Sequence, residues 1–381
     1  MPRSAPLAAG LAAGLVATAL LAGCTAQPPN PTPAQSSPPA EADGVQPSGS
    51  PIDVVTGLAA PWSMVRIHPE QADSVTLVSQ RDDGAILLVL PDGGLQQIGT
   101  IPGVVHNGEG GLLGLAYLDD GDTEWLYAYE TTEVDNRIIR IEFGDEAGLT
   151  NEPEVMLSGL SKAGNHNGGR IAFGPDGMLY ATVGDASNPD TAQDPASLNG
   201  KILRMTPTGD VPDDNPFDGS LVYSLGHRNP QGLAWDADGQ LWAAEFGQDT
   251  WDEFNRIEPG GNYGWPVVEG IASTDSATEF IDPWVQWATD DASPSGLTYV
   301  GGTFFMAGLG GERLWAIYVD DEAKIAAPVE WFTGQYGRIR DVAPGPDGSL
   351  WMLTNNTDGR GGPRDGDDRI LQVELNPLVE G

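Results

Sequence analysis

Basic residues are scarce in this sequence. Its 381 residues include 18 Lys and Arg against 55 Asp and Glu, which gives a formal net charge of −37 at pH 7. A charge of this size repels nucleic acid and anionic lipid head groups, so neither is expected as a partner. An anionic ligand would need a local cluster of arginines to overcome the overall repulsion.

Cysteine is almost absent as well. Cys24 is the only one, so a disulfide within the chain is excluded. It follows a segment in which Arg3 is the only charged residue and residues 7–22 form a small, apolar run. The letters LAGC at 21–24 are typical of bacterial lipoproteins, whose cysteine carries a lipid. We therefore predict a signal peptide over 1–23 and a lipid on Cys24 that anchors the protein outside the cell membrane. An ordinary signal peptide with an unrelated thiol is the alternative.

Apolar periodicity is missing from residues 25–51, which are rich in Pro, Ser, Ala and Gln. A segment of this composition cannot bury a core. We predict a disordered tether over 24–51 and a single folded domain over 52–381, whose roughly 330 residues suffice for one large core.

Helical periodicity is nearly absent from that domain, where short β-prone runs alternate with clusters of Gly, Asp, Asn and Pro. One frame recurs: an apolar strand, an Asp-Gly turn, and a second strand containing Leu-Trp or Leu-Tyr. Its turn glycines are Gly121, Gly177, Gly239 and Gly348. Degenerate copies occupy 62–80 and 295–308. Six units of about 55 residues predict an all-β fold, a six-bladed β-propeller of four-stranded antiparallel blades. A two-layer β-sandwich is the alternative.

Loops rich in glycine and polar residues lie between these frames, and a propeller gathers such loops at the mouth of its central channel. His166, in the loop NHNGG, lies ten residues before the Asp176-Gly177 turn, and Asp185 lies eight residues after it. Both therefore fall at the same end of one hairpin, where a carboxylate can orient an imidazole that acts as a base. A purely structural role in the loop stays open for both residues.

Two groups of polar side chains suggest an anionic ligand. Arg228 and Asn229 lie in a turn-like loop, and Arg338 and Arg340 alternate on a predicted strand, so that both face one side. Arginine pairs bind carboxylates through forked hydrogen bonds. Surface ion pairs are the alternative, although two arginines on one face repel each other unless an anion lies between them.

Several motifs occur in order along the chain: GEGGLLGLA (108–116), NHNGGRIAFGPDG (165–177), LGHRNPQGLAW (225–235) and GGNYGWP (260–266). Together they closely resemble the soluble glucose/sorbosone dehydrogenase family. The resemblance covers nearly the whole folded part. It implies a six-bladed propeller that uses pyrroloquinoline quinone (PQQ) and calcium to oxidise an aldose and then passes electrons to an unidentified acceptor.

The resemblance also implies roles for individual residues. His166 matches the base that takes the proton of the anomeric hydroxyl while hydride passes to PQQ, and Asp185 matches its carboxylate partner. The other matches are donors that stabilise charge on the quinone oxygens, calcium ligands, and a pair that binds the PQQ carboxylates. The donors to the quinone oxygens are Arg228 and Asn229, and Arg228 is thereby also a catalytic residue. The calcium ligands are the carbonyls of Gly247 and Gln248, with Asp252 on the same loop. The pair that binds the PQQ carboxylates is Arg338 and Arg340.

Two positions depart from the family pattern. Glu109 stands where characterised members bind the cofactor through a glutamine. The cation expected in the fifth blade falls near Gly310, where none is present, and Arg313 is out of phase with it. The loss of one cationic partner typically weakens carboxylate binding at least about tenfold, so either PQQ binds weakly or the cofactor is a different one.

Two other functions compete with the dehydrogenase. One is a propeller that binds sugars or cell-wall fragments without catalysis. The other is a calcium-dependent lactonase, which would need several carboxylates and asparagines on the channel axis. The loops of this chain are organised around arginines instead.

Overall fold

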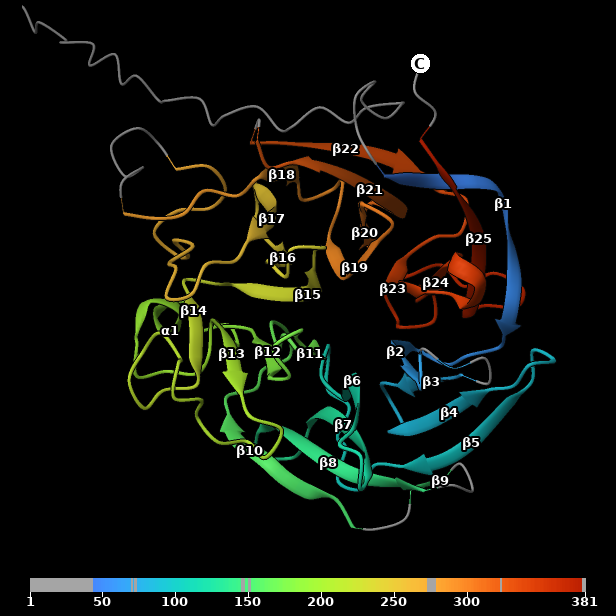
Figure 1. The fold of residues 1–381 in the computed structure, drawn as a ribbon, viewed down its shortest axis with the longest axis horizontal. Coiled ribbons are helices and arrows are strands. Elements are labelled where there is room, and N and C mark those ends of the chain that lie inside the picture. Colours follow the sequence, from blue (N-terminus) through green and yellow to red (C-terminus); the bar gives the residue numbers. More distant parts are fainter. Residues whose placement is uncertain are drawn as a thin grey trace, which may run out of the picture. The chain divides into compact units, whose positions relative to one another are not determined.

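The computed structural model describes residues 44–69, 71, 74–144, 148–149, 152–272, 279–322 and 324–378. The predicted signal peptide, the Cys24 that is predicted to carry a lipid, and the predicted tether up to residue 43 lie outside these ranges. Six antiparallel sheets follow one another around a common centre (Figure 1). The predicted six-bladed β-propeller is therefore confirmed.

The first three blades are built from strands that follow one another along the chain. Blade one contains β2 (Pro61–Ile67), β3 (Val75–Gln80), β4 (Ala85–Val89) and β5 (Leu95–Thr100). Blade two contains β6 (Leu112–Asp119), β7 (Glu124–Thr131), β8 (Asn136–Gly144) and β10 (Glu154–Leu160), with the short β9 (Gly148–Leu149) beside β8. Blade three contains β11 (Ile171–Phe173), β12 (Leu179–Val183), β13 (Lys201–Met205) and β14 (Val222–Leu225).

The other three blades complete the ring. Blade four contains β15 (Asn229–Trp235), β16 (Leu241–Phe246), β17 (Trp251–Arg256) and β18 (Val285–Ala288). Blade five contains β19 (Pro294–Val300), β20 (Thr303–Gly308), β21 (Arg313–Asp320) and β22 (Ile325–Trp331). Blade six contains β23 (Ile339–Pro344), β24 (Leu350–Thr354), β25 (Arg369–Pro377) and β1 (Val45–Thr56). Only α1 (Asp190–Gln193) and the 3₁₀ turn η1 (Pro346–Gly348) are helical in the described ranges, where no helix could cross a membrane.

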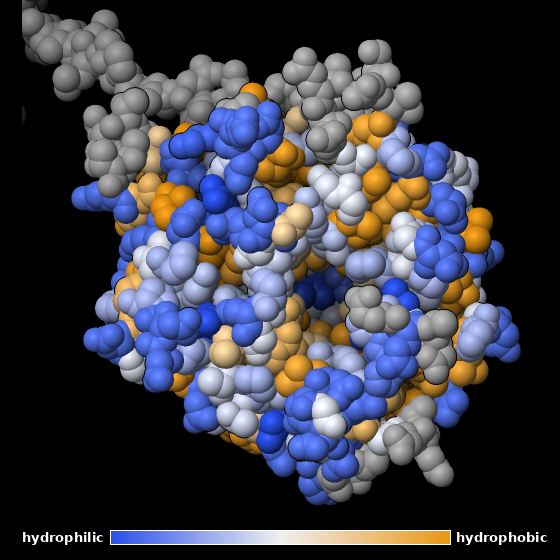
Figure 2. All heavy atoms as spheres, in the orientation of Figure 1, coloured by the Kyte–Doolittle hydropathy of each residue, from blue (hydrophilic) through white to orange (hydrophobic). Residues whose placement is uncertain are grey.

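Each predicted copy of the repeated frame forms the first hairpin of a blade. The innermost strands β2, β6, β11, β15, β19 and β23 each pair with the next strand of the chain. The turn glycines have φ values of 74–90°, which glycine adopts without steric cost. The frame therefore marks the strands that surround the channel. The face of the ring in Figure 2 is hollowed near its centre, where strongly hydrophilic side chains gather.

Apolar side chains fill the spaces between neighbouring blades. Successive side chains of a strand point to opposite faces of its sheet. In β20, Phe304 and Met306 therefore pack with blade four, whereas Phe305 and Ala307 pack with blade six. Six clusters of buried residues arise in this way, and each contains side chains of at least two neighbouring blades. Every blade thus needs both of its neighbours to bury the apolar side chains of its two faces.

The N-terminal strand closes the ring by joining the last blade. β1 runs antiparallel to β25, from Val45 opposite Pro377 to Thr56 opposite Arg369. The predicted tether over 24–51 therefore extends too far, because the strand begins at Val45 and not at Ile52. Most side chains of β1 are exposed or half-buried, so the strand lacks apolar alternation. Backbone pairing to the open edge of β25 holds it instead.

Candidate active site

The predicted base and its carboxylate partner are in contact. His166 lies before β11 and Asp185 follows β12, at the same end of one hairpin as predicted. Nδ1 of His166 lies 2.8 Å from Oδ1 of Asp185, and the two side chains are 12% and 0% exposed. A carboxylate at Nδ1 favours the tautomer with the proton on that nitrogen. Nε2 is then the nitrogen that can accept a proton from a ligand.

The backbone of His166 is held in an unusual conformation. Its φ is 56°, a left-handed value that few residues other than glycine adopt. Its N–H donates to Oε2 of Glu109 at 3.0 Å, and its carbonyl accepts from Ala186 N at 3.0 Å. A Cβ on Gly184 would lie 2.1 Å from the same carbonyl, so only glycine fits there. The surrounding loops therefore fix the ring in place.

The carboxylate of Asp185 has three hydrogen-bond partners. Besides His166, its carboxylate accepts from Ser187 N at 2.8 Å and from the indole Nε1 of Trp265 at 2.9 Å. The ring of Trp265 also lies 5.6 Å from the guanidinium carbon of Arg228. Trp265 belongs to the GGNYGWP motif, but its role was not predicted. It joins the base in blade three to the arginine in blade four.

Glu245 holds Arg228 and Asn229 in position. Its Oε1 accepts from the backbone N–H of Arg228 and, at 3.3 Å, from that of Asn229. Its Oε2 lies 2.7 Å from Nδ1 of the buried His227. The side-chain oxygen of Asn229 accepts from Gly168 N at 2.9 Å, so its amide nitrogen is the group that could donate to a ligand. Glu245 was not predicted, because nothing in its strand sequence distinguishes it.

The side chain of Arg228 lies among carbonyl oxygens. Its Nη1 donates to the carbonyl of Gly247 and, at 3.3 Å, to that of Phe246. Burial lowers the pKa of Arg228, and nearby carboxylates, Asp185 foremost, oppose that shift. The two carbonyl oxygens and the nearby carboxylates attract cations, and calcium prefers oxygen ligands of this kind. These oxygens suit the calcium that the resemblance implies near Gly247, but the carbonyl of Gly247 accepts from Arg228, so the guanidinium must leave it before the ion can bind.

Asp252 and the 247–251 loop support those carbonyls. Asp252 accepts from Gly247 N at 2.9 Å and from Ser293 N at 2.6 Å. Burial raises its pKa to about 7, although these amide bonds oppose the shift. Oε1 of Glu269 accepts from four successive amides, the first that of Gln248 at 2.6 Å. Both oxygens of Asp252 are bonded to backbone, so it shapes the loop. Within the described residues, no three His, Cys, Asp or Glu side chains form a metal-binding group.

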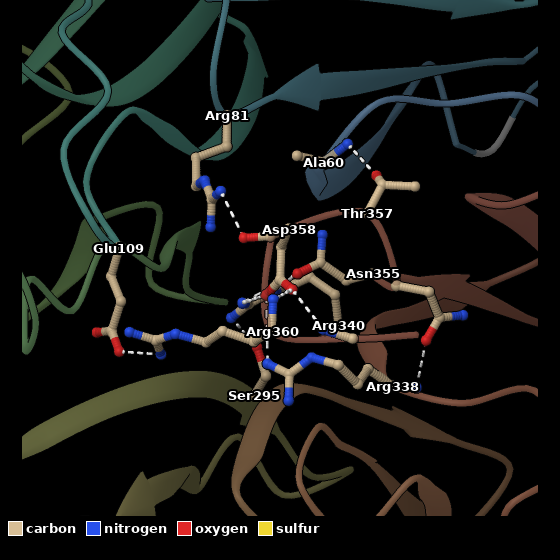
Figure 3. A network of polar contacts seen from close by, with 12 residues as sticks. Ala60, Arg81, Glu109, Ser295, Arg338, Arg340, Asn355, Thr357, Asp358 and Arg360 are labelled. Carbon is tan, nitrogen blue, oxygen red and sulfur yellow. Dashed lines mark hydrogen bonds and ion pairs between the residues drawn. The ribbon is translucent and has the colours of Figure 1, made fainter. Parts of the chain in front are cut away.

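Arg338 and Arg340 do share one side of the channel, as predicted. Asp358 lies between them: its Oδ2 is 3.3 Å from Nη2 of Arg338 and 3.8 Å from Nη2 of Arg340 (Figure 3). Burial, and next the charge of Arg338, lower the pKa of Arg340 to about 9. Burial raises the pKa of Asp358, but Arg338 and other arginines bring it below its usual range. Asp358 is thus the anion that two neighbouring arginines require.

A cavity opens beside this cluster. Its wall combines three arginines, one carboxylate, one amide, one hydroxyl and apolar side chains. The lining residues are Trp62, Glu109, Gln231, Phe246, Ser293, Leu309, Arg338, Arg340 and Arg360. Glu109 links the cavity to the base through the N–H of His166. Three arginines and an aromatic ring suit a flat, polyanionic ligand, so the residues present fit PQQ.

The blade-five position lacks a cation, as expected. A Cβ on Gly310 would already lie 2.4 Å from Oγ of Ser293. Arg313 is bonded elsewhere, with Nη1 2.7 Å from Oε2 of Glu330 and Nε 2.8 Å from the carbonyl of Gly311. Arg360, from the loop between β24 and β25, reaches the cavity instead. Arg360 was not predicted, because it lies outside the family motifs of the sequence.

Residues 58–365 match the model of the family described as Glucose / Sorbosone dehydrogenase. The chain belongs to this family. Aldose sugar dehydrogenase YliI of Escherichia coli is 30% identical over 291 residues, which cover 68% of this chain and 78% of that protein. Quinoprotein glucose dehydrogenase B of Acinetobacter calcoaceticus is 35% identical over 234 residues, which cover 52% of this chain and 49% of that relative.

Solved structures of the dehydrogenase family agree with the fold. The PQQ-bound form of aldose sugar dehydrogenase from Streptomyces coelicolor is 48% identical and superposes with a TM-score of 0.81. The alignment covers 89% of this chain and 100% of that one. The resemblance inferred from the sequence motifs is thereby confirmed.

We predict that Glu245→Gln destabilises this family member. The amide would present an N–H group to His227 or to the backbone N–H groups that the carboxylate now binds. His227 can accept that N–H in its other tautomer, but the charge-assisted bonds to the two backbone N–H groups become weaker, so the free energy of unfolding should fall by about 1–3 kcal/mol. Denaturant titration measures it. Glu258→Gln removes the same charge from a side chain that is 48% exposed and should cost less than about 0.5 kcal/mol. Equal losses in both variants would contradict the role of Glu245.

Proposed function

We propose that the chain is a PQQ- and calcium-dependent aldose dehydrogenase that oxidises the anomeric hydroxyl of a sugar to a lactone. Family membership makes it an oxidoreductase, which argues against a sugar-binding propeller without catalysis. The observation that carries the proposal is the contact of His166 with Asp185, one loop away from an arginine-lined cavity. Relatives named as glucose and aldose sugar dehydrogenases support it.

His166 is the general base of the proposed reaction. Its Nε2 takes the proton of the anomeric hydroxyl, and the imidazolium that forms is stabilised by the buried carboxylate of Asp185. Trp265 and Ser187 hold that carboxylate toward the ring. The proton therefore leaves the sugar toward a base whose orientation is fixed before the sugar binds.

The remaining polar groups hold the cofactor. When bound, PQQ supplies a quinone that accepts the hydride of the sugar. Arg338 and Arg340 would bind its carboxylates, and Arg228 and Asn229 would donate to its quinone oxygens. The carbonyls at Gly247 and Gln248 would hold calcium, with further ligands from the cofactor and water.

Export and anchoring form a separate part of the proposal. The apolar run over 7–22 and the LAGC pattern support a lipid on Cys24 and a place outside the cell membrane. From there the enzyme would pass electrons to an acceptor that its residues do not identify.

Replacing His166 by Ala should abolish most turnover without unfolding the protein. Loss of a general base typically lowers the rate about 10²–10⁴-fold. Reduction of an artificial dye, with saturating PQQ and calcium and a panel of aldoses, measures turnover. The variant should still unfold cooperatively and bind PQQ, with a somewhat lower melting temperature because the buried Asp185 loses one donor. Unchanged turnover in the variant, or no dye reduction with any aldose, would contradict the proposal.

Removal of calcium should release PQQ and stop turnover. After chelation and dialysis, added Ca²⁺ should restore both, whereas Mg²⁺ should restore little because it demands a more regular shell of closer ligands. Turnover and cofactor absorbance follow the two effects. Full activity in a sample whose metal analysis finds no calcium would argue against the metal.

The lipid should depend on Cys24. Cells that produce the full chain with labelled palmitate should incorporate the label and retain the protein with the membrane. The Cys24→Ser variant should carry no label and leave the membrane fraction. A labelled Ser variant, or an unlabelled original protein, would refute the anchor.

A further inference from the structure

Arg360 is the most accessible cation of the cavity. It lies two residues after Asp358, and its guanidinium crosses the cavity mouth to the carboxylate of Glu109, from the loop before β6 (Figure 3). Nη1 of Arg360 is 2.5 Å from Oε1 of Glu109, and the two side chains are 52% and 20% exposed. The pair joins loops that are 251 positions apart in the sequence.

The other two arginines of the cavity are bound to fixed partners. Arg340 is only 6% exposed and donates to Oε1 of Gln231 at 2.9 Å and to Oδ1 of Asn355 at 3.2 Å. Arg338 is 12% exposed and pairs with the buried Asp358 through Nη2, while its Nε is buried without a partner. Among the described residues, Glu109 is the one partner found for the guanidinium of Arg360. Arg360 is therefore the arginine whose bonds a ligand can most easily replace.

The backbone at Arg360 is held by the same carboxylate that organises the other arginines. Oδ1 of Asp358 accepts from Arg360 N at 2.9 Å and from Gly361 N at 3.3 Å. A Cβ on Gly361 would lie 2.7 Å from the carbonyl of Asn356 and 3.0 Å from Cδ of Arg338. The loop thus packs closely against Arg338. Its position is fixed, while the long side chain of Arg360 can exchange partners.

We propose that Arg360 binds a carboxylate of the polyanionic cofactor, and that Glu109 is the counterion which this carboxylate displaces. The inference rests on the proposed function. Arg360 then supplies, from blade six, the cation that is missing near Gly310 in blade five. Oε2 of Glu109 keeps its bond to the N–H of His166 during the exchange, so the base loop stays anchored when the cavity fills.

A PQQ titration in the presence of calcium tests the proposal without turnover. Cofactor absorbance gives the Kd, and the shift of the melting temperature with PQQ gives an independent measure. Arg360→Gln should raise the Kd at least about tenfold, because a cationic partner of a bound carboxylate is lost. Arg360→Lys should recover part of that loss, since it restores the charge without the fork.

Glu109→Gln should have the opposite effect. Its amide oxygen can still accept from His166 N, but its nitrogen cannot accept from Arg360. The guanidinium is then free for the ligand, and the Kd should fall severalfold. Arg364→Gln is the matched control: it removes the same charge from the same loop, where Arg364 bonds the carbonyls of Gln335 and Gly334 outside the cavity. Its Kd should be unchanged.

The outcomes separate this inference from the proposed function. If the original protein binds PQQ and the Arg360→Gln variant binds it equally well, Arg360 has no role and the inference alone is refuted. A Glu109→Gln variant that weakens binding as much as Arg360→Gln would also refute it. If the original protein binds no PQQ at saturating calcium, both the inference and the proposed function are wrong.

Discussion

Closure of the ring by β1 and β25 is the constraint on which the rest of the structure depends. Every cluster of buried side chains is shared by two or more blades, and Val55 of β1 belongs to the cluster between blades six and one. No blade can bury its own faces, so an open ring would expose apolar surface at both ends. His166, Arg228 and Arg340 come from loops or strands of three different blades. Their separations are therefore fixed only while all six blades are packed together.

The acidic sequence places several carboxylates in or near the interior of the site, and each of them needs hydrogen-bond donors. A buried carboxylate is costly unless donors satisfy it. The buried Asp185 receives N–H groups of Ser187 and Trp265, and the buried Glu245 receives two backbone amides. The half-buried Glu269 receives four. These anions serve as anchors for loops, since each fixes several backbone groups at once. Donors fixed in this way need no reorganisation when charge develops in a reaction, which is the property that electrostatic catalysis requires.

The sequence predicted those features that rest on local patterns. The Asp-Gly turns located the inner hairpins, and counting from one turn placed His166 opposite Asp185, because the register of a hairpin follows from its turn. β1 was missed because edge pairing, not apolar alternation, holds it. Glu109, Trp265 and Arg360 were missed as partners because their contacts span 57, 80 and 251 positions. Such contacts depend on how loops of different length meet over the channel, which no local pattern specifies.

The two departures from the family pattern, Glu109 and the missing cation near Gly310, are connected through Arg360. Taken singly, Glu109 adds an anion beside an anionic ligand, and the empty position near Gly310 removes a cation, so both would weaken binding. In the fold Glu109 faces Arg360, and the two charges cancel across the cavity mouth. The chain therefore has its cation on a different blade, at a place where it is neutralised when no ligand is bound. The carboxylate of Glu109 holds the exposed Arg360 in position until a ligand binds. A ligand carboxylate can take its place because it is the same chemical group.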